Sequence, residues 1–352
     1  MVFHRFRRSG IDNREGAVQK SRPFAASIIL AAGLFLLVVL TGVSIAYGAA
    51  DIQVSTVWNS FVHFDPAIAS HQIIHELRMP RAVAAAAAGA FLAVSGAIMQ
   101  GMTRNPLASP SIMGITAGSS FVLALAFIFD AHASPNKLVF WSFVGSGLGA
   151  FLVFGIGALS KRGLTPVKLA LAGSAVTALL TSVSSALAMH FDVARDLSFW
   201  YAGGVAGIRW ESVRVVLPIA VVGLAAAMLI SRSITVLSLG EEVAKGLGQK
   251  VKLAKVSGLL VVLLLTGAAV SLAGVVGFVG LVIPHITRFL VGVDYRWIIP
   301  CSAVLGGLLL IMADIMARMI NPPFETPLGA VTALVGVPFF LYLSRREGGG
   351  TR

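Results

Sequence analysis

Two histidines at helical spacing are the first candidates for chemistry in this chain. His71 and His75 lie four residues apart and Glu76 follows directly, so a helix would place both imidazoles on one face. The zinc metalloprotease pattern needs His-Glu-x-x-His, which this segment lacks. A solvated amphipathic turn is the better interpretation, and we predict no metal site here.

Nucleotide and nucleophile chemistry are also missing from the sequence. No Gly-x-x-x-x-Gly-Lys-Ser/Thr loop occurs, so we do not expect the chain to bind ATP through a P-loop. No serine, histidine and aspartate arrangement is recognisable either. The sequence therefore predicts a conduit without catalytic residues or a cofactor of its own.

Three arginines form a second candidate site. Arg78 and Arg81 flank Met79-Pro80, where an apolar stretch begins, and Arg318 stands near the end of another. Asp314 precedes Arg318 by one helical turn, so the two side chains share a face and are expected to pair. The arginines either reach the membrane interface with their long side chains or form a basic collar for acidic groups of an external partner.

Hydroxyl side chains form a third candidate, a stripe along one apolar stretch. Steps of three and four residues place them on one helix face. The stripe has two interpretations, hydrogen bonding between helices and the lining of a translocation path. Its members are Ser174, Thr177, Thr181, Ser184 and Ser185.

A polar segment, Leu239–Gly248, interrupts the apolar sequence. It contains Glu241, Glu242 and Lys245 among three glycines, where the surrounding chain is mostly Leu, Val, Ala and Gly. A membrane protein without catalysis of its own must receive energy from a partner. We expect this segment to be the place where it does.

The composition places these residues in a membrane protein. Of the 352 residues, 57% are hydrophobic and 12% are charged, and the mean hydropathy is +0.89. A soluble domain of this length could not bury so much apolar surface. The net charge of +12 comes from residues between the apolar runs, which favours a topological role over nucleic-acid binding. Cys301 is the single cysteine and excludes an internal disulfide.

Uncharged runs predict an all-α integral membrane protein with about ten transmembrane helices, since about 20 apolar residues cross a bilayer. The run 256–287 is too long for one span, and its glycines predict a break near residues 274–280. A cleavable signal at the N-terminus is the weaker alternative, because its apolar region exceeds the usual ~7–15 residues. The predicted spans are 24–47, 82–103, 110–129, 138–160, 168–190, 213–231, 256–274, 278–291, 297–318 and 327–344.

The basic residues support this count. With the N-terminus in the cytoplasm, 20 of the 27 lysines and arginines fall on the cytoplasmic side. The predicted organisation is a basic cytoplasmic segment 1–22, a transmembrane domain 23–346 and a cytoplasmic tail 347–352. Residues 232–255 form a cytoplasmic loop within the domain. The basic residues left outside are Arg78, Arg81, Lys137, Arg195, Arg209, Arg214 and Arg318.

Several motifs, in order and over nearly all of 24–346, resemble the FecCD/BtuC-type family of ABC importer permeases, which take up iron–siderophores, haem and vitamin B12. The resemblance covers the following motifs: Arg78-Met-Pro-Arg81, Ser95–Gly101, Arg104–Ala108, Leu171-Ala-Gly173, Phe199–Gly204, Gly240–Gly248, Gly277–Ile286 and Gly336–Phe340. The segment Ile320–Pro327 is most similar to Gram-positive iron–siderophore permeases.

The resemblance implies a type II ABC importer permease fold in the bacterial inner membrane, with both termini cytoplasmic. It implies a second permease subunit, identical or homologous, two cytoplasmic ATPases that hold ATP and Mg²⁺, and an extracytoplasmic substrate-binding lipoprotein. Arg78, Arg81 and Arg318 would dock that lipoprotein, and the hydroxyl stripe would line the path. The residues implied in ATPase coupling are Gly240, Glu241, Glu242, Ala244, Leu247 and Gly248.

We therefore expect a permease subunit that moves an iron(III)–siderophore into the cytoplasm and binds no metal itself. Haem or vitamin B12 remains an alternative cargo. An ion-coupled secondary transporter is the alternative from another class, but it would need paired acids at mid-membrane. Asp314 is the only acid inside a predicted span, and it lies toward the outer end.

Overall fold

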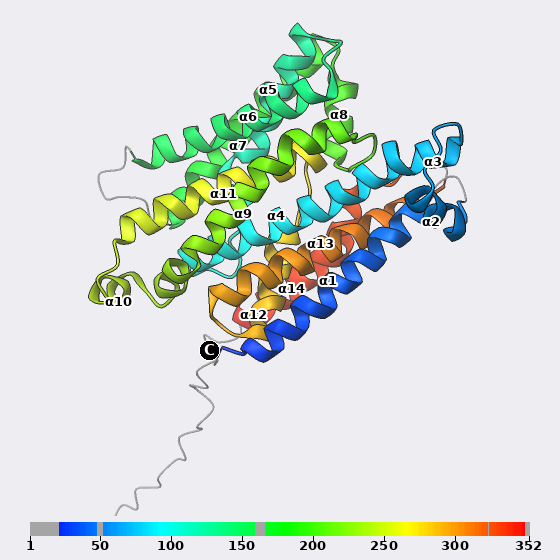
Figure 1. Cartoon of the computed structure of the whole chain (residues 1–352). Helices are drawn as coiled ribbons and strands as arrows, with labels where there is room; N and C mark the ends of the chain where they lie inside the picture. The colour runs from blue at the N-terminus through cyan, green and yellow to red at the C-terminus, as the bar shows by residue number, and fades with distance from the viewer. Residues whose placement is uncertain (1–20, 48–51, 159–165, 323, 349–352) are drawn as a thin grey trace, which may run out of the picture.

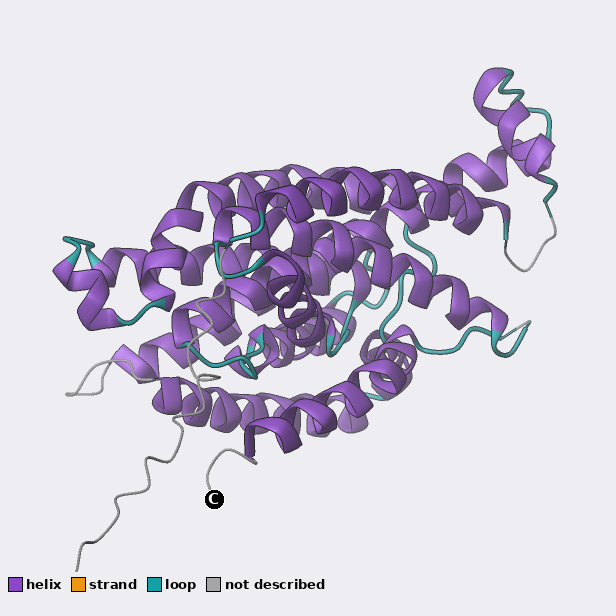
Figure 2. Cartoon of the chain, turned by 90° about the horizontal axis from the view of Figure 1, so that it is seen from below, coloured by secondary structure: helices purple, strands orange, loops and turns teal. Residues whose placement is uncertain are grey.

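The computed structural model describes residues 21–47, 52–158, 166–322 and 324–348. Most of the predicted basic segment 1–22, the end of the tail 347–352, and Lys161 and Arg162 lie outside the described residues. Within the described residues every regular element is helical, as Figure 1 and Figure 2 show. The prediction of an all-α protein is confirmed.

The helices follow one another along the chain with short connections. A π-helical turn, η1 (Ile74–Arg78), joins α3 to α4, and a 3₁₀ turn, η2 (Pro110–Met113), precedes α5. The α-helices are α1 (Pro23–Ala46), α2 (Val54–Val62), α3 (Ala69–Ile73), α4 (Met79–Thr103), α5 (Ile115–Phe129), α6 (Pro135–Ala158), α7 (Pro166–His190), α8 (Ala194–Ala202), α9 (Trp210–Ser238), α10 (Glu241–Gly246), α11 (Val251–Ala273), α12 (Val279–Val291), α13 (Tyr295–Met319) and α14 (Leu328–Gly348).

The predicted spans correspond to helices. Among the described residues, seven helical stretches are long and apolar enough to cross a membrane, and α5, α12 and α14 supply three shorter apolar ones. The predicted break after α11 is confirmed, since Gly274 and Phe278 both have positive φ angles of 63° and 66°. A left-handed residue ends a helix, so α11 and α12 are separate elements.

The polar segment after the sixth predicted span departs from the prediction. We expected a loop over 232–255, but α9 continues to Ser238, α10 occupies Glu241–Gly246 and α11 begins at Val251. A charged residue such as Arg232 ends an apolar run, but arginine is a good helix former and does not end the helix. The apolar runs did not predict α2, α3 and α8, which lie outside them.

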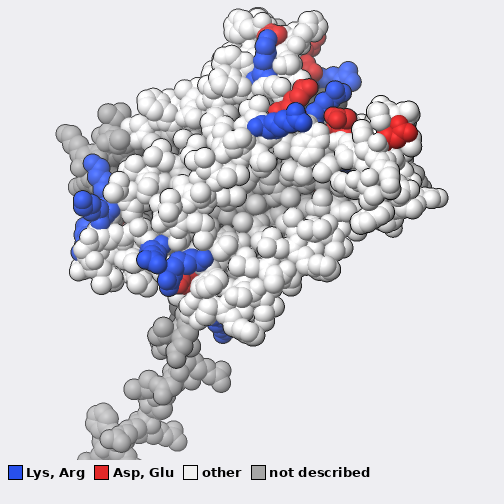
Figure 3. Space-filling model, in the orientation of Figure 1, with Lys and Arg blue, Asp and Glu red and all other residues white. Residues whose placement is uncertain are grey.

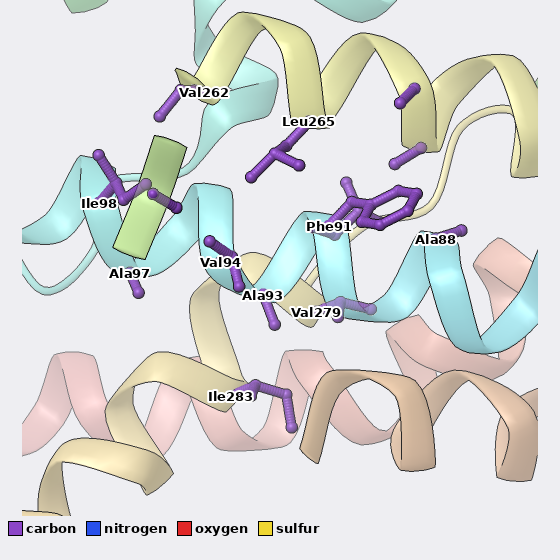
Figure 4. Packing of buried hydrophobic residues seen from close by; sticks show 14 of the residues in the cluster. Ala88, Phe91, Ala93, Val94, Ala97, Ile98, Val262, Leu265, Val279 and Ile283 are labelled. Atoms are coloured by element: carbon purple, nitrogen blue, oxygen red, sulfur yellow. The ribbon is translucent and has the colours of Figure 1, made fainter. Parts of the chain in front are cut away.

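Helix α4 is the centre of the protein. It packs against α13, α11, α12 and α9, and Figure 4 shows its side chains Phe91, Val94 and Ile98 facing residues of α11 and α12. A Cβ atom on Gly89 would collide with the backbone of Gly306 in α13. Small residues therefore allow the helix backbones to touch, as is common in membranes.

Charged side chains gather at opposite ends of the helices. Figure 1 places α10 at one end and α2 with α3 at the other, and Figure 3 shows an uncharged surface between the charged groups at the two ends. This distribution is the one that a bilayer requires, because lipid-facing charges are costly. Each end therefore offers one candidate site.

Candidate functional site

Arg81 lies at the end of the molecule that carries α2 and α3, between two acids from distant parts of the chain. Its Nε and Nη2 donate to Asp314 of α13 at 3.1 and 2.9 Å, and its Nη1 and Nη2 donate to Glu325 at 2.5 and 3.1 Å. Glu325 belongs to the connection between α13 and α14. The fork of the guanidinium thus holds two carboxylates at once.

Arg318 uses the same buried acid. Its Nη2 lies 3.0 Å from Asp314, one turn earlier on α13, which confirms the predicted pairing of these two residues. It also donates to the carbonyl oxygens of Ser44 and Tyr47, at 3.0 and 2.8 Å, at the end of α1. Arg318 therefore ties α13 to α1.

Arg78 also holds the end of α1. Its Nη1 donates to the carbonyl oxygens of Ile45 and Ala46, each at 2.7 Å, and the residue is buried. The last carbonyls of a helix have no partner within the helix, so charged donors placed there satisfy them. The structure thus brings the three predicted arginines together around the ends of α1 and α13.

The histidine segment next to this cluster has structural contacts. His71 is buried and accepts a hydrogen bond from the backbone of Asp65 at 3.1 Å, and the ring of His75 lies 2.9 Å from the carbonyl oxygen of Ser60. Within the described residues no three His, Cys, Asp or Glu side chains could hold a metal ion together. These hydrogen bonds hold His71 and His75 against Asp65 and Ser60, which precede them in the chain.

The predicted hydroxyl stripe lies on α7. Ser174 and Ser185 are exposed, Thr177 and Thr181 are half-buried, and Ser184 is fully buried. Ser174 and Ser184 donate to carbonyl oxygens of their own helix, those of Ala170 and Leu180. Ser184 therefore faces the protein interior, and the other four members are at least partly accessible on the surface of α7.

The polar segment at the opposite end forms the short helix α10. Gly240 precedes it with a φ of 127°, an angle at which a side chain would be strained, and Gly248 follows with a φ of 76°. Ala244 is completely buried against the rest of the protein, whereas Val243 and Leu247 are exposed. The helix thus presents apolar side chains outward.

Two contacts fix α10 to its neighbours. Glu241 accepts a hydrogen bond from Lys255 of α11 at 2.5 Å, and this bond lowers the pKa of the Glu241 carboxyl. Gln249 donates to the carbonyl oxygen of Ser233 in α9 at 2.9 Å. Arg104, which ends α4, lies close to Gly240 and adds positive charge near Glu241. The carboxylate of Glu241 is therefore already paired with Lys255 of the same chain.

Sequence reasoning missed the partners of Arg81. Asp314 and Glu325 lie 233 and 244 residues further along the chain, so no local spacing relates them to it. It also missed a cavity of about 310 Å³ between α8 and the end of α11. Phe127, Trp200 and Leu272 line this cavity with Asp196.

Comparison with known proteins identifies the chain's family. Residues 36–346 match the FecCD transport family. The chain belongs to this family. It is therefore a permease of the ABC transporter class, a multi-pass protein of the bacterial inner membrane, and not an enzyme.

Individual relatives of this FecCD permease cover most of its length. It is 62% identical to the iron(3+)-hydroxamate import permease FhuB of Bacillus subtilis over 93% of this chain and 85% of that protein. It is 48% identical to the iron-uptake permease FeuB of the same organism, over 92% and 96%. Its identity with the hemin permease HmuU of Yersinia pestis is 37%, over 89% and 94%.

A solved structure confirms the fold. The inward-facing structure of a metal-chelate type ABC transporter superposes with a TM-score of 0.80 at 30% sequence identity, over 91% of this chain and 99% of that one. The prediction of an ABC importer permease fold is thus confirmed.

Proposed function

We propose that this chain is the membrane-spanning subunit of an importer for an iron(III)–siderophore of the hydroxamate type. The 62% identity to an iron(3+)-hydroxamate import permease over 93% of the chain is the observation that carries the proposal. The chain itself makes no bond to iron, because the siderophore already supplies the ligands of the metal. It holds no nucleotide or other cofactor.

The importer would contain four further components. A second permease subunit, identical or homologous, would complete the path between the two. A pair of ATPases with ATP and Mg²⁺ would bind on the α10 side, which we place in the cytoplasm with both termini. A substrate-binding lipoprotein would dock at the opposite end. This orientation agrees with the distribution of basic residues along the sequence.

The two charged ends would have separate roles. Carboxylates of the loaded binding protein would meet the Arg78, Arg81 and Arg318 cluster, and the siderophore would pass the hydroxyls of α7. Closure of the ATPases would then press on α10, where Val243 and Leu247 are exposed and Ala244 is buried. Glu241 would transmit this movement to α11 through Lys255.

Transport in proteoliposomes tests the proposal. The permease would be reconstituted with its ATPases and binding protein, and uptake of a radiolabelled iron(III) hydroxamate would be compared with uptake of haem and of vitamin B12. We expect ATP-dependent uptake of the hydroxamate complex alone. Uptake without ATP would contradict the importer mechanism, and preference for haem or vitamin B12 would contradict the proposed cargo.

A further inference from the structure

The two carboxylates on Arg81 lie in different environments. The side chain of Asp314 is 2% exposed and is shared with Arg318, whereas the side chain of Glu325 is 44% exposed. Removing one partner from a buried ion pair is strongly destabilising, because it leaves a buried charge. An ion pair at the surface contributes little. Asp314 is therefore a fixed partner of Arg81, and Glu325 is an exchangeable one.

Glu325 also covers the outer edge of the guanidinium. Its two carboxylate oxygens accept hydrogen bonds from Nη1 and Nη2 of Arg81, while Nε and Nη2 of Arg81 also donate to Asp314. The side chain of Arg81 is only 13% exposed as a result of this packing. An acidic group that approaches from outside thus meets an arginine whose accessible edge already holds a carboxylate.

A backbone hydrogen bond attaches the connection that carries Glu325 to α13. The backbone N–H of Thr326 donates to the carbonyl oxygen of Ala317 in the last turn of α13, at 3.0 Å. Phe324, on the other side of Glu325, is 71% exposed. Glu325 can therefore leave Arg81 by rotation of its own side chain, without unfolding either α13 or α14.

We propose that Glu325 is an internal substitute for the carboxylate of the extracytoplasmic partner, and that docking displaces it from Arg81. The inference rests on the proposed function, since it requires a partner that presents a carboxylate at this end. The exchange leaves Arg81 with two carboxylates before and after docking. Release of Glu325 removes the contact between Arg81 and the connection, which stays bonded to α13 through Thr326.

Affinity measurements on the complete complex in nanodiscs test this exchange. The probe is the binding protein that co-purifies with the permease from its native membrane. Glu325→Gln removes the competing charge, so we expect binding to tighten about threefold to fivefold, the equivalent of one exposed ion pair. Glu211→Gln, an exposed acid at the start of α9, is the matched control and should change the affinity less than about twofold.

The same affinity measurement in a variant that lacks Arg81 separates this inference from the proposed docking role. The variant Arg81→Gln removes the arginine, and Asp314 keeps Arg318 as its partner at 3.0 Å. We expect it to weaken docking by at least about tenfold, as for loss of a buried charged contact, and to abolish the effect of Glu325→Gln. Tightening by Glu325→Gln both with and without Arg81, or no tightening in the native protein, would overturn the exchange. Unchanged docking in Arg81→Gln would instead refute the role of Arg81 and, with it, the exchange.

A fluorophore on the connection gives an independent measurement. Cys301 is the only cysteine and is buried, so Phe324→Cys with Cys301→Ser accepts one label at an exposed position. Addition of the binding protein should change the emission of this label. With Glu325→Gln the emission should already resemble the docked value before addition. A label that does not respond to docking would contradict the release of Glu325 from Arg81.

Discussion

The two charged ends of this permease are built in opposite ways. At the end that carries α2 and α3, Arg78 and Arg318 donate to carbonyl oxygens of α1, and Asp314 is buried between two arginines. At the α10 end the ion pair of Glu241 and Lys255 is partly exposed, with 38% and 26% of the side chains accessible. One set of charges lies inside the fold and the other lies on its surface.

This difference separates charges that hold helices together from charges that are available to a partner. Breaking a buried ion pair costs much free energy, so the cluster of Arg78, Arg81 and Arg318 offers a partner only the edge of Arg81 that Glu325 covers. The exposed apolar side chains of α10 need no such release before they make contact. Four predictions test the comparison, beginning with the largest effect.

Asp314→Asn should be the most damaging single change. It leaves Arg81 and Arg318 without their buried carboxylate, and the expected loss of stability is about 3–5 kcal/mol. The measurement is the midpoint of thermal unfolding of the purified permease in detergent. Glu325→Gln is the control and should cost less than about 1 kcal/mol, because that pair is partly exposed. Equal losses would show that burial does not distinguish the two acids.

Arg78→Gln should have the next largest effect. It removes the charged donor that the carbonyl oxygens of Ile45 and Ala46 share, and we expect a loss of stability of about 1–3 kcal/mol. The same unfolding assay, with hydrogen exchange at the end of α1, would detect the loss. Stability at the native value would mean that the end of α1 does not depend on this arginine.

Leu247→Asp tests the α10 surface. The side chain is 66% exposed, so the fold should keep its stability within about 0.5 kcal/mol. An added charge in the proposed apolar contact with the ATPase should reduce uptake by about tenfold or more. Leu253→Asp, also exposed but on α11, is the control. Native uptake by the Leu247 variant would remove this side chain from coupling.

The smallest effect should come from Glu241 and should depend on pH. Its pKa is lowered in the folded protein, first by the hydrogen bond from Lys255, so the ionised form stabilises the fold. This stabilisation is present above the ordinary value of 4.5 and is lost as the pH falls through the lowered pKa. Glu241→Gln should therefore reduce stability by less than about 1 kcal/mol at pH 7, and the difference should disappear once the pH is below the lowered pKa. A difference that persists at low pH would assign the effect to packing.

The sequence predicted the helices better than their contacts. The ten spans could be read from apolar runs, and the glycines at 274–280 marked the break after α11, because both signals are local. Asp314 and Arg318 were also predictable, since they are four residues apart on one helix. Arg81 and Glu325 meet because α4 and α13 pack together, and the local sequence around either residue does not predict the other as its partner. Ser184 and Ser185 show the same limit, as neighbours that differ completely in burial.

The length of α4 has a mechanical consequence. This helix is continuous from Met79 to Thr103, about 36 Å at 1.5 Å per residue, with Arg81 in its first turn and Arg104 directly after its last. Close backbone contacts at Gly89 and Gly96 join it to α13 and α12. A shift of Arg81 along the helix axis would therefore reach Arg104, beside Gly240, through the helix backbone and without a relay of side chains. The single helix α4 thus links the two charged ends of the protein.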